Sequence, residues 1–486
     1  MASPIAVDHA SQPPMLPPQP QRPVWATTCR DCTLIIQGNL KNAAIAAACL
    51  GVTILLQSAP LQALPVAVQD AAWSHLPAPA WVQVDMAWVR EFPKMNSRLS
   101  GSLRRGDQVL VTGCTPDCQQ PHAWALLGTD GAVPLKILHT LPVPDQALST
   151  SSAALYIYGK LPHPASPVFA QASSKSKVLR REKAEFRVAF TANPQAQAQG
   201  WLQRPDGGWM RTQDVILFTP SEFEGIHDPH DRAFVFVRRK VKLHQADNQG
   251  PDVGYARYTT LPLLGEKAGK ALVPNGWLPR SLVRVVRTYA RPGTVKPKDR
   301  WIHIDLTEQV LTAYQGDRMV FATLVSTGKS GRKSTRTHEG TFRIYAKSVH
   351  TNMRGKPWDD YFAEGVPHAM HFDGGRALHG AYWHDQFGIE KSHGCVNLSP
   401  KDAAWLFEWV PPSMPAGWTE FLPLPGKNPS VVVQVDKKGK VAPSNLSQGQ
   451  PQAQLQQVVE AREPRDQRYG PNAPYHRPIA RNHSHL

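Results

Sequence analysis

The chain has 486 residues. This length is too great for one ordinary domain and predicts roughly two to four units with linkers. Lys and Arg number 54 against 38 Asp and Glu, a net charge of +16. This charge favours a polyanionic neighbour such as nucleic acid, anionic lipid or an acidic cell-wall polymer, and a basic surface that binds nothing explains it equally well. No nucleic-acid-binding motif is recognised in the sequence, and an apolar export segment conflicts with DNA binding, so we exclude nucleic acid as a partner.

The N-terminal part contains two segments of different character. Residues 1–41 are rich in Pro and Gln, which predicts disorder. Residues 42–69 carry no charged side chain, and their most apolar part, 43–56, is about as long as a signal-peptide core and short for a membrane span. We therefore expect export to the periplasm or cell envelope, with either a cleaved signal or a retained anchor as the only membrane contact. A buried soluble helix is the alternative.

Two stretches upstream of the C-terminal third are typical of small all-β units. Short apolar alternations broken by Gly, Pro and Asp run through 80–146 and again through 152–221. In the second stretch a turn at 205–208 separates two strands that carry Trp201 and Trp209. Residues 222–298 contain basic runs and form a connecting region without an assigned function.

Both stretches loosely resemble bacterial SH3-like modules. The sequences that carry the resemblance are SGSLRRGDQVLVTG in the first and GWLQ in the second. The resemblance implies wall attachment through exposed aromatic side chains. The alternative is a pair of structural spacers with Trp201 and Trp209 in their cores.

The cysteines outside the apolar segment fall into three groups. Cys29 and Cys32 form a CxxC without a second pair nearby, so we interpret them as incidental or redox-linked. Cys114 and Cys118 flank a turn, and the sequence leaves open whether they form a local disulfide or remain two free thiols. Cys395 has no evident partner, which is unusual for an exported protein.

Residues 299–435 have longer and better patterned strands than the rest of the chain. Residues 301–314 and 319–326, with a turn at 315–317, predict a β hairpin, and TFRIYAKSV predicts a further strand. One helix is expected over 400–410, capped within 397–399 and with Ala403, Leu406 and Phe407 on its apolar face. The unit is therefore expected to be mainly β. Beyond it, residues 436–486 lack hydrophobic periodicity and are predicted to be disordered.

The densest group of reactive side chains lies in LHGAYWHDQFGIEKSHGCVNLSP. A thiolate at Cys395 would attack an amide carbonyl but needs a base or a positive charge to form near neutral pH. His379, His384 and His393 are close in sequence and supply candidate bases. Amide groups around Gly394 and Cys395 could form an oxyanion hole.

This segment resembles the signature of the YkuD-type L,D-transpeptidases, in which a His precedes a Ser/Thr-His-Gly-Cys-apolar-Asn/Arg block. The matching residues are His379, Gly380 and Ser392 to Asn397. The strands TEQVLTAYQGDRMVFATLVSTG and THEGTFRI also resemble the opening strands of that family's catalytic domain. The resemblance implies a β-sandwich catalytic domain with a short helix over 299–435.

The resemblance also implies roles for single residues. Cys395 would be the nucleophile and His379 its base, and the Gly380 carbonyl would orient the imidazole. The remaining roles are His393 beside the nucleophile, Ser392 and Asn397 as loop supports, and Trp383 and Tyr382 as lining of the peptide groove. His371, just upstream, is either a further groove residue or an uninvolved surface histidine. Many relatives have Arg where this chain has Asn397, which puts the anchoring of the substrate carboxylate in doubt.

The family implies a two-step exchange on peptidoglycan stem peptides that makes 3→3 cross-links, with no metal or organic cofactor, and acylation by carbapenems. L,D-carboxypeptidase activity and attachment of protein to the wall are alternatives through the same acyl-enzyme. Two other classes are weighed against it. One is a zinc peptidase using His371, His379, His393 and Cys395, which lacks an HExxH helix. The other is a wall-binding scaffold whose catalytic unit has decayed.

Overall fold

The computed structural model describes most of the chain between its two ends. The expected disordered segment 1–41, the apolar segment 42–69 and nearly all of the expected C-terminal tail lie outside the described part. In the part described, no helix is long and apolar enough to cross a membrane. The described residues are 73, 75–141, 156–229, 232–243, 253–331, 333–355, 361–437, 439 and 441.

The C-terminal unit is built from two sheets and one helix. Its first sheet has the strand order β16-β27-β26-β25-β34-β28, and the second contains β29 to β33. Side chains of both sheets and of helix α3 share one buried core that includes Ile302, Met370 and Leu406. The elements are β16 (Ile226–His227), β25 (Arg300–Asp305), β26 (Val310–Gln315), β27 (Arg318–Leu324), β28 (Gly340–Arg343), β29 (Ala346–Arg354), β30 (Phe362–Asp373), β31 (Arg376–Gly380), β32 (Val396–Leu398), α3 (Pro400–Trp409), β33 (Glu420–Phe421) and β34 (Val432–Asp436). The mainly β expectation is confirmed.

Two expected strands are each divided in the structure. Residues 301–314 form β25 and β26, because the Asp305 carboxylate accepts the amides of Thr307 (2.8 Å) and Glu308 (2.9 Å) and turns the chain. Gln309 completes this turn with a φ of 54°. The expected strand TFRIYAKSV splits into β28, which pairs with β34, and β29, which pairs with β30, so the chain crosses there from one sheet to the other.

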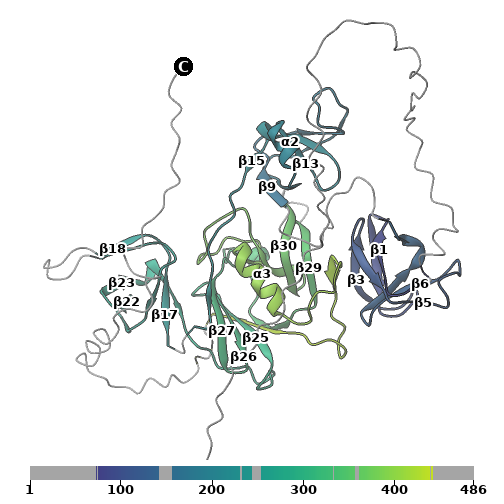
Figure 1. The fold of residues 1–486 in the computed structure, drawn as a ribbon. Coiled ribbons are helices and arrows are strands. Elements are labelled where there is room, and N and C mark those ends of the chain that lie inside the picture. Colours follow the sequence, from purple (N-terminus) through teal and green to yellow (C-terminus); the bar gives the residue numbers. More distant parts are fainter. Residues whose placement is uncertain are drawn as a thin grey trace, which may run out of the picture. The chain divides into compact units, whose positions relative to one another are not determined.

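Helix α3 begins and ends as its sequence predicts. Ser399 is the N-cap, and its hydroxyl accepts the amide of Asp402 at 3.1 Å. The expected apolar face is buried, and the helix packs beside β30 (Figure 1). At the other end the buried Lys347 ammonium donates to the carbonyls of Phe407 (2.7 Å), Val410 (2.7 Å) and Pro412 (2.9 Å). A lysine of β29 therefore provides hydrogen bonds for the carbonyl groups at and just after the C-terminal end of the helix.

The first upstream unit is a small β structure with its own core. Cys114 and Cys118 form a disulfide in it, which settles the alternative left open by the sequence. Trp418, from the segment after α3, is buried in this core, and β33 pairs with β3. The elements are β1 (Ala78–Val82), β2 (Met86–Arg90), β3 (Leu99–Arg104), β4 (Gln108–Val111), β5 (Gly113–Thr115), β6 (Trp124–Leu127), β7 (Gly131–Pro134) and β8 (Leu138–His139).

The second upstream unit places its tryptophans away from its core. Leu202 and Met210 are buried in that core, whereas Trp201 and Trp209, on the alternate face, are half-buried. The turn at 205–208 is present, with Gly207 at φ 87°. The SH3-like resemblance of both units stays a prediction. The elements are β9 (Tyr156–Lys160), β10 (Ser166–Phe169), β11 (Val178–Glu182), β12 (Arg187–Thr191), α2 (Pro194–Ala198), β13 (Trp201–Gln203), β14 (Trp209–Arg211) and β15 (Ile216–Leu217).

The connecting region is itself folded. Around Val235, Val285 and Leu278 it has a separate buried core. Its strands are β17 (Phe234–Val237), β18 (Val241–Leu243), β19 (Val253–Tyr255), β20 (Thr260–Pro262), β21 (Gly265–Lys267), β22 (Lys270–Val273), β23 (Gly276–Pro279) and β24 (Val283–Val286).

Candidate active site

Strand register brings the candidate nucleophile and base together. β31 and β32 are parallel neighbours, with His379 opposite Asn397, and Cys395 directly precedes β32. Cys395, His379 and His393 line one cleft of about 880 Å³, and His371 and Trp383 line it too. Ser392 and Asn397 complete the set, so seven of the residues that the sequence singled out line one cavity.

The surroundings of His379 fix its tautomer. The imidazole is 1 % exposed, and its Nδ1 lies 3.2 Å from the carbonyl oxygen of Gly380. Because a carbonyl only accepts, Nδ1 carries the proton and Nε2 keeps a free lone pair. Burial lowers the pKa of His379 to about 4; the Gly380 carbonyl acts against this and His371 adds slightly to it. The ring is therefore a neutral base at physiological pH.

The thiol of Cys395 is also neutral in this environment. Burial raises its pKa, while the amide of Ala377 and the charge of Arg376 act in the opposite direction. The sulfur lies 3.9 Å from the carbonyl oxygen of Gly375, within reach of a weak thiol hydrogen bond. A neutral thiol beside a neutral imidazole requires general-base transfer of the proton during attack, rather than a standing thiolate.

A hydrogen-bonded loop supports the nucleophile from behind. The Ser392 hydroxyl donates to the Cys395 carbonyl and accepts the Gly394 amide at 3.0 Å. The Gly394 amide is therefore engaged, and it is not the free oxyanion donor that the sequence suggested. Gly394 contributes its shape instead: its φ is 127°, and a Cβ there would meet Arg376 Nε at 3.0 Å.

Thr337 fastens this loop to the basic loop that follows β27. Its buried hydroxyl donates to the Gly394 carbonyl at 2.8 Å and accepts the Gly328 amide at 2.9 Å. The residue is distant in sequence from the motif, and no local pattern marks it. It was therefore missed from the sequence.

Comparison with known proteins finds similarity in the part of the chain that contains this cleft. Residues 299–433 match the YkuD family model, described as the L,D-transpeptidase catalytic domain. These residues belong to the YkuD family. The putative L,D-transpeptidase YciB of Bacillus subtilis (strain 168) is 26 % identical over 133 residues, which are 24 % of this chain and 64 % of that protein. The chain therefore spans somewhat under two thirds of that relative.

Solved structures of similar domains exist. The catalytic domain of the E. faecium L,D-transpeptidase is 25 % identical and covers 29 % of this chain and 98 % of its own, with a TM-score of 0.23. The L,D-transpeptidase (Yku) from Stackebrandtia nassauensis is 26 % identical and covers 30 % of this chain and 58 % of its own, with a TM-score of 0.21.

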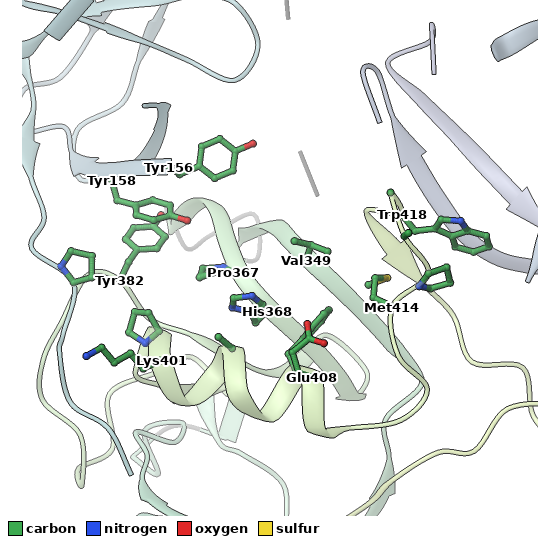
Figure 2. Close-up of a pocket in the computed structure, with 17 residues that line it drawn as sticks. Tyr156, Tyr158, Val349, Pro367, His368, Tyr382, Lys401, Glu408, Met414 and Trp418 are labelled. Atoms are coloured by element: carbon green, nitrogen blue, oxygen red, sulfur yellow. The ribbon is translucent and has the colours of Figure 1, made fainter. Parts of the chain in front are cut away.

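Two of the family-derived roles do not fit the positions in this YkuD domain. Tyr382 does not line the cleft: it is 1 % exposed, stacks on Tyr158 at 3.8 Å, and its hydroxyl donates to the Glu364 carbonyl at 2.8 Å. Figure 2 shows the Tyr158 and Tyr382 rings facing each other at a second pocket, whose lining does not include Cys395. The side chain of Asn397 contacts His384 (3.0 Å) rather than the nucleophile loop.

A charged cluster borders the thiol of Cys395, and the sequence did not predict it. Arg376 contacts Asp373 (3.2 Å), the Arg336 carbonyl (2.9 Å) and His338 (3.0 Å). His338 also lies 2.9 Å from the Asp373 carboxylate. The cluster holds the positive charge of Arg376 close to Cys395, and this charge favours the thiolate form of the cysteine.

The connecting region anchors the loop between His379 and Ser392. The Tyr258 hydroxyl donates to the Asp385 carbonyl (3.0 Å), and Arg284 donates to the Gly388 carbonyl (2.8 Å). This loop of the YkuD domain is thus held by residues to which the sequence assigned no function.

The described residues offer no ligand set for a metal. Nowhere in the described ranges do three His, Cys, Asp or Glu side chains converge as metal ligands would. His371, His379, His393 and Cys395 share the cleft without forming such a set, so they do not support the zinc alternative.

Proposed function

We propose that the YkuD domain is a peptidoglycan L,D-transpeptidase with Cys395 as nucleophile and His379 as general base. The observation that carries the proposal is the meeting of these two side chains in one cleft, with the His379 proton fixed on Nδ1 by Gly380. Cys395, the one free cysteine among the described residues, shares this cleft with a preoriented neutral imidazole, an arrangement suited to acyl transfer.

In the first step, Nε2 of His379 accepts the thiol proton as the sulfur of Cys395 attacks the carbonyl of the third stem residue. The tetrahedral intermediate collapses, the bond to the terminal D-alanine breaks, and the imidazolium returns its proton to the leaving amine. A thioester remains on Cys395. Since the Gly394 amide donates to Ser392, the Cys395 amide is the remaining candidate to stabilise the oxyanion.

In the second step an acceptor amine attacks the thioester, passes its proton to His379 and becomes acylated, while the thiol is restored. A diaminopimelate side-chain amine would give a 3→3 cross-link. Water would give carboxypeptidase activity and a protein amine would give attachment to the wall, with the same acyl-enzyme in each case.

Related domains support the acyl-enzyme. The E. faecium catalytic domain has been solved acylated by ertapenem, and that protein is 26 % identical over the region it shares with this chain. We infer that Cys395 is acylated by carbapenems as well. We also propose that the protein is exported to the periplasm or cell envelope, with membrane contact only through 42–69, because its substrate lies outside the cytoplasm.

The test is product analysis by mass spectrometry. The full-length protein is incubated with disaccharide-tetrapeptide, next to Cys395→Ala and His379→Gln. Loss of D-alanine with 3→3 dimers, absent from both variants, is the expected result, and loss without dimers identifies a hydrolase. Folded protein that gives no Cys395-dependent product would leave the scaffold as the better account.

A further inference from the structure

The cleft around Cys395 is strongly basic. Its lining includes four cationic side chains and, among the described residues, no carboxylate. The four are Arg187, Arg354, Arg376 and Lys391. A cavity with this charge distribution favours an anionic ligand.

Three of these cations belong to the YkuD domain, and two of them have polar partners within it. Arg376 is held by Asp373 (3.2 Å), and Lys391 donates to Gln386 (2.7 Å). Arg354 lies 4.4 Å from the centre of the Phe362 ring, towards the end of β29.

Arg187 is different, because it comes from strand β12 of the second upstream unit. Its guanidinium lies 4.9 Å from the ring centre of Tyr361 and 5.2 Å from that of Trp383. Trp383 in turn lies 5.7 Å from His379, ring centre to ring centre. No carboxylate of the described residues pairs with Arg187. A guanidinium that lies between two aromatic rings, with no carboxylate partner in the described part of the chain, is held in position to bind the carboxylate of a ligand.

The backbone that carries Arg187 is fixed to the YkuD domain. β12 runs parallel to β30 with Arg187 opposite Ala363, and the Ala189 amide donates to the Glu364 carboxylate at 3.0 Å. Arg204, 2 % exposed, forms an ion pair with Glu364 at 2.8 Å. The upstream unit is therefore joined to the domain through buried contacts next to the cleft.

We propose that Arg187 is a specificity-determining residue that binds a non-terminal carboxylate of the acyl-donor stem peptide. This inference rests on the proposed transpeptidase function. The second upstream unit then forms part of the donor site rather than only a spacer or a wall anchor. The Arg187 guanidinium makes charge-assisted hydrogen bonds to this carboxylate. Asn397 does not make them, because its side chain is turned towards His384.

The experiment compares full-length wild type with Arg187→Gln. Arg181→Gln is the matched control, because Arg181 is an exposed arginine of β11 in the same unit. Donors are a disaccharide-tetrapeptide with free carboxylates and the same molecule with its non-terminal carboxylates converted to amides. D-alanine release gives kcat and KM, and alkylation by neutral iodoacetamide reports the reactivity of Cys395.

Arg187→Gln should raise KM for the free-carboxylate donor about 10- to 100-fold, the range of a lost charged hydrogen bond, and leave kcat within about threefold. The amidated donor should not distinguish the variant from wild type, and alkylation should be unchanged. Arg181→Gln should behave as wild type. Arg187→Lys should recover part of the effect, because it keeps the charge without the planar fork.

Two results would overturn the inference. One is an unchanged KM for the free-carboxylate donor; the other is an equal loss with both donors, which a merely structural role would produce. Failure of the proposed function looks different, because wild type itself would then release no D-alanine, and the inference would fall with it.

Discussion

Thr337→Val tests whether the loop behind the nucleophile is held as the structure shows. Valine has nearly the shape of threonine but leaves the Gly328 amide and the Gly394 carbonyl without their partner, now 2.9 and 2.8 Å away. Thr337 is 3 % exposed, so water does not readily replace it. Two lost hydrogen bonds, with each orphaned group costing about 1 to 3 kcal/mol, predict a loss of about 2 to 6 kcal/mol in the free energy of unfolding.

The same change should slow acylation of Cys395 at least about tenfold, because a small displacement of a nucleophile is costly. Unfolding in urea gives the free energy, and intact mass after timed exposure to a carbapenem gives the rate. Thr341→Val is the control: its hydroxyl bonds Gln434 at 2.6 Å but is exposed, so the change should stay below about 0.5 kcal/mol. If Thr337→Val behaved like this control in both assays, Thr337 would not support the loop.

Three further outcomes follow from buried groups. Because burial raises the pKa of Cys395, the thiolate absorbance that distinguishes wild type from Cys395→Ser should appear only at a higher pH than for an exposed cysteine, and thiolate at pH 7 would refute the neutral pair. Because burial lowers the pKa of His379 from 6.5 to about 4, the base stays neutral at pH 5, so acylation should fall only as pH drops through about 4; an apparent pKa near 6.5 would contradict this. Lys347→Met leaves three carbonyls at the end of α3 without a donor and should cost about 2 to 4 kcal/mol of unfolding free energy in urea, whereas no loss would show that the lysine is dispensable.

The parts of the site that the sequence predicted are those that lie close together in the chain. The spacing from His379 to Cys395 is short enough that one pair of parallel strands, β31 and β32, unites them. The cap and apolar face of α3 were likewise local signals.

The parts that the sequence did not predict depend on distant pairing or on a choice of face. Arg187 reaches the cleft only because β12 pairs with β30, which no local pattern indicates. Tyr382 and Trp383 are adjacent, yet one packs on Tyr158 and the other lines the cleft. The turn after Asp305 lacks Gly and Pro, so its strand-like composition hid it.

The central claim is that Cys395 forms a thioester with the donor peptide. Full-length protein is mixed with a tetrapeptide donor whose side-chain amine is blocked, so that no acceptor is present, and is quenched in acid within seconds for intact mass and peptide mapping. A mass increase equal to the tripeptide acyl group, located on Cys395 and missing from Cys395→Ala, is the predicted result. Release of D-alanine without any adduct on Cys395, or an adduct on another residue, would contradict the account.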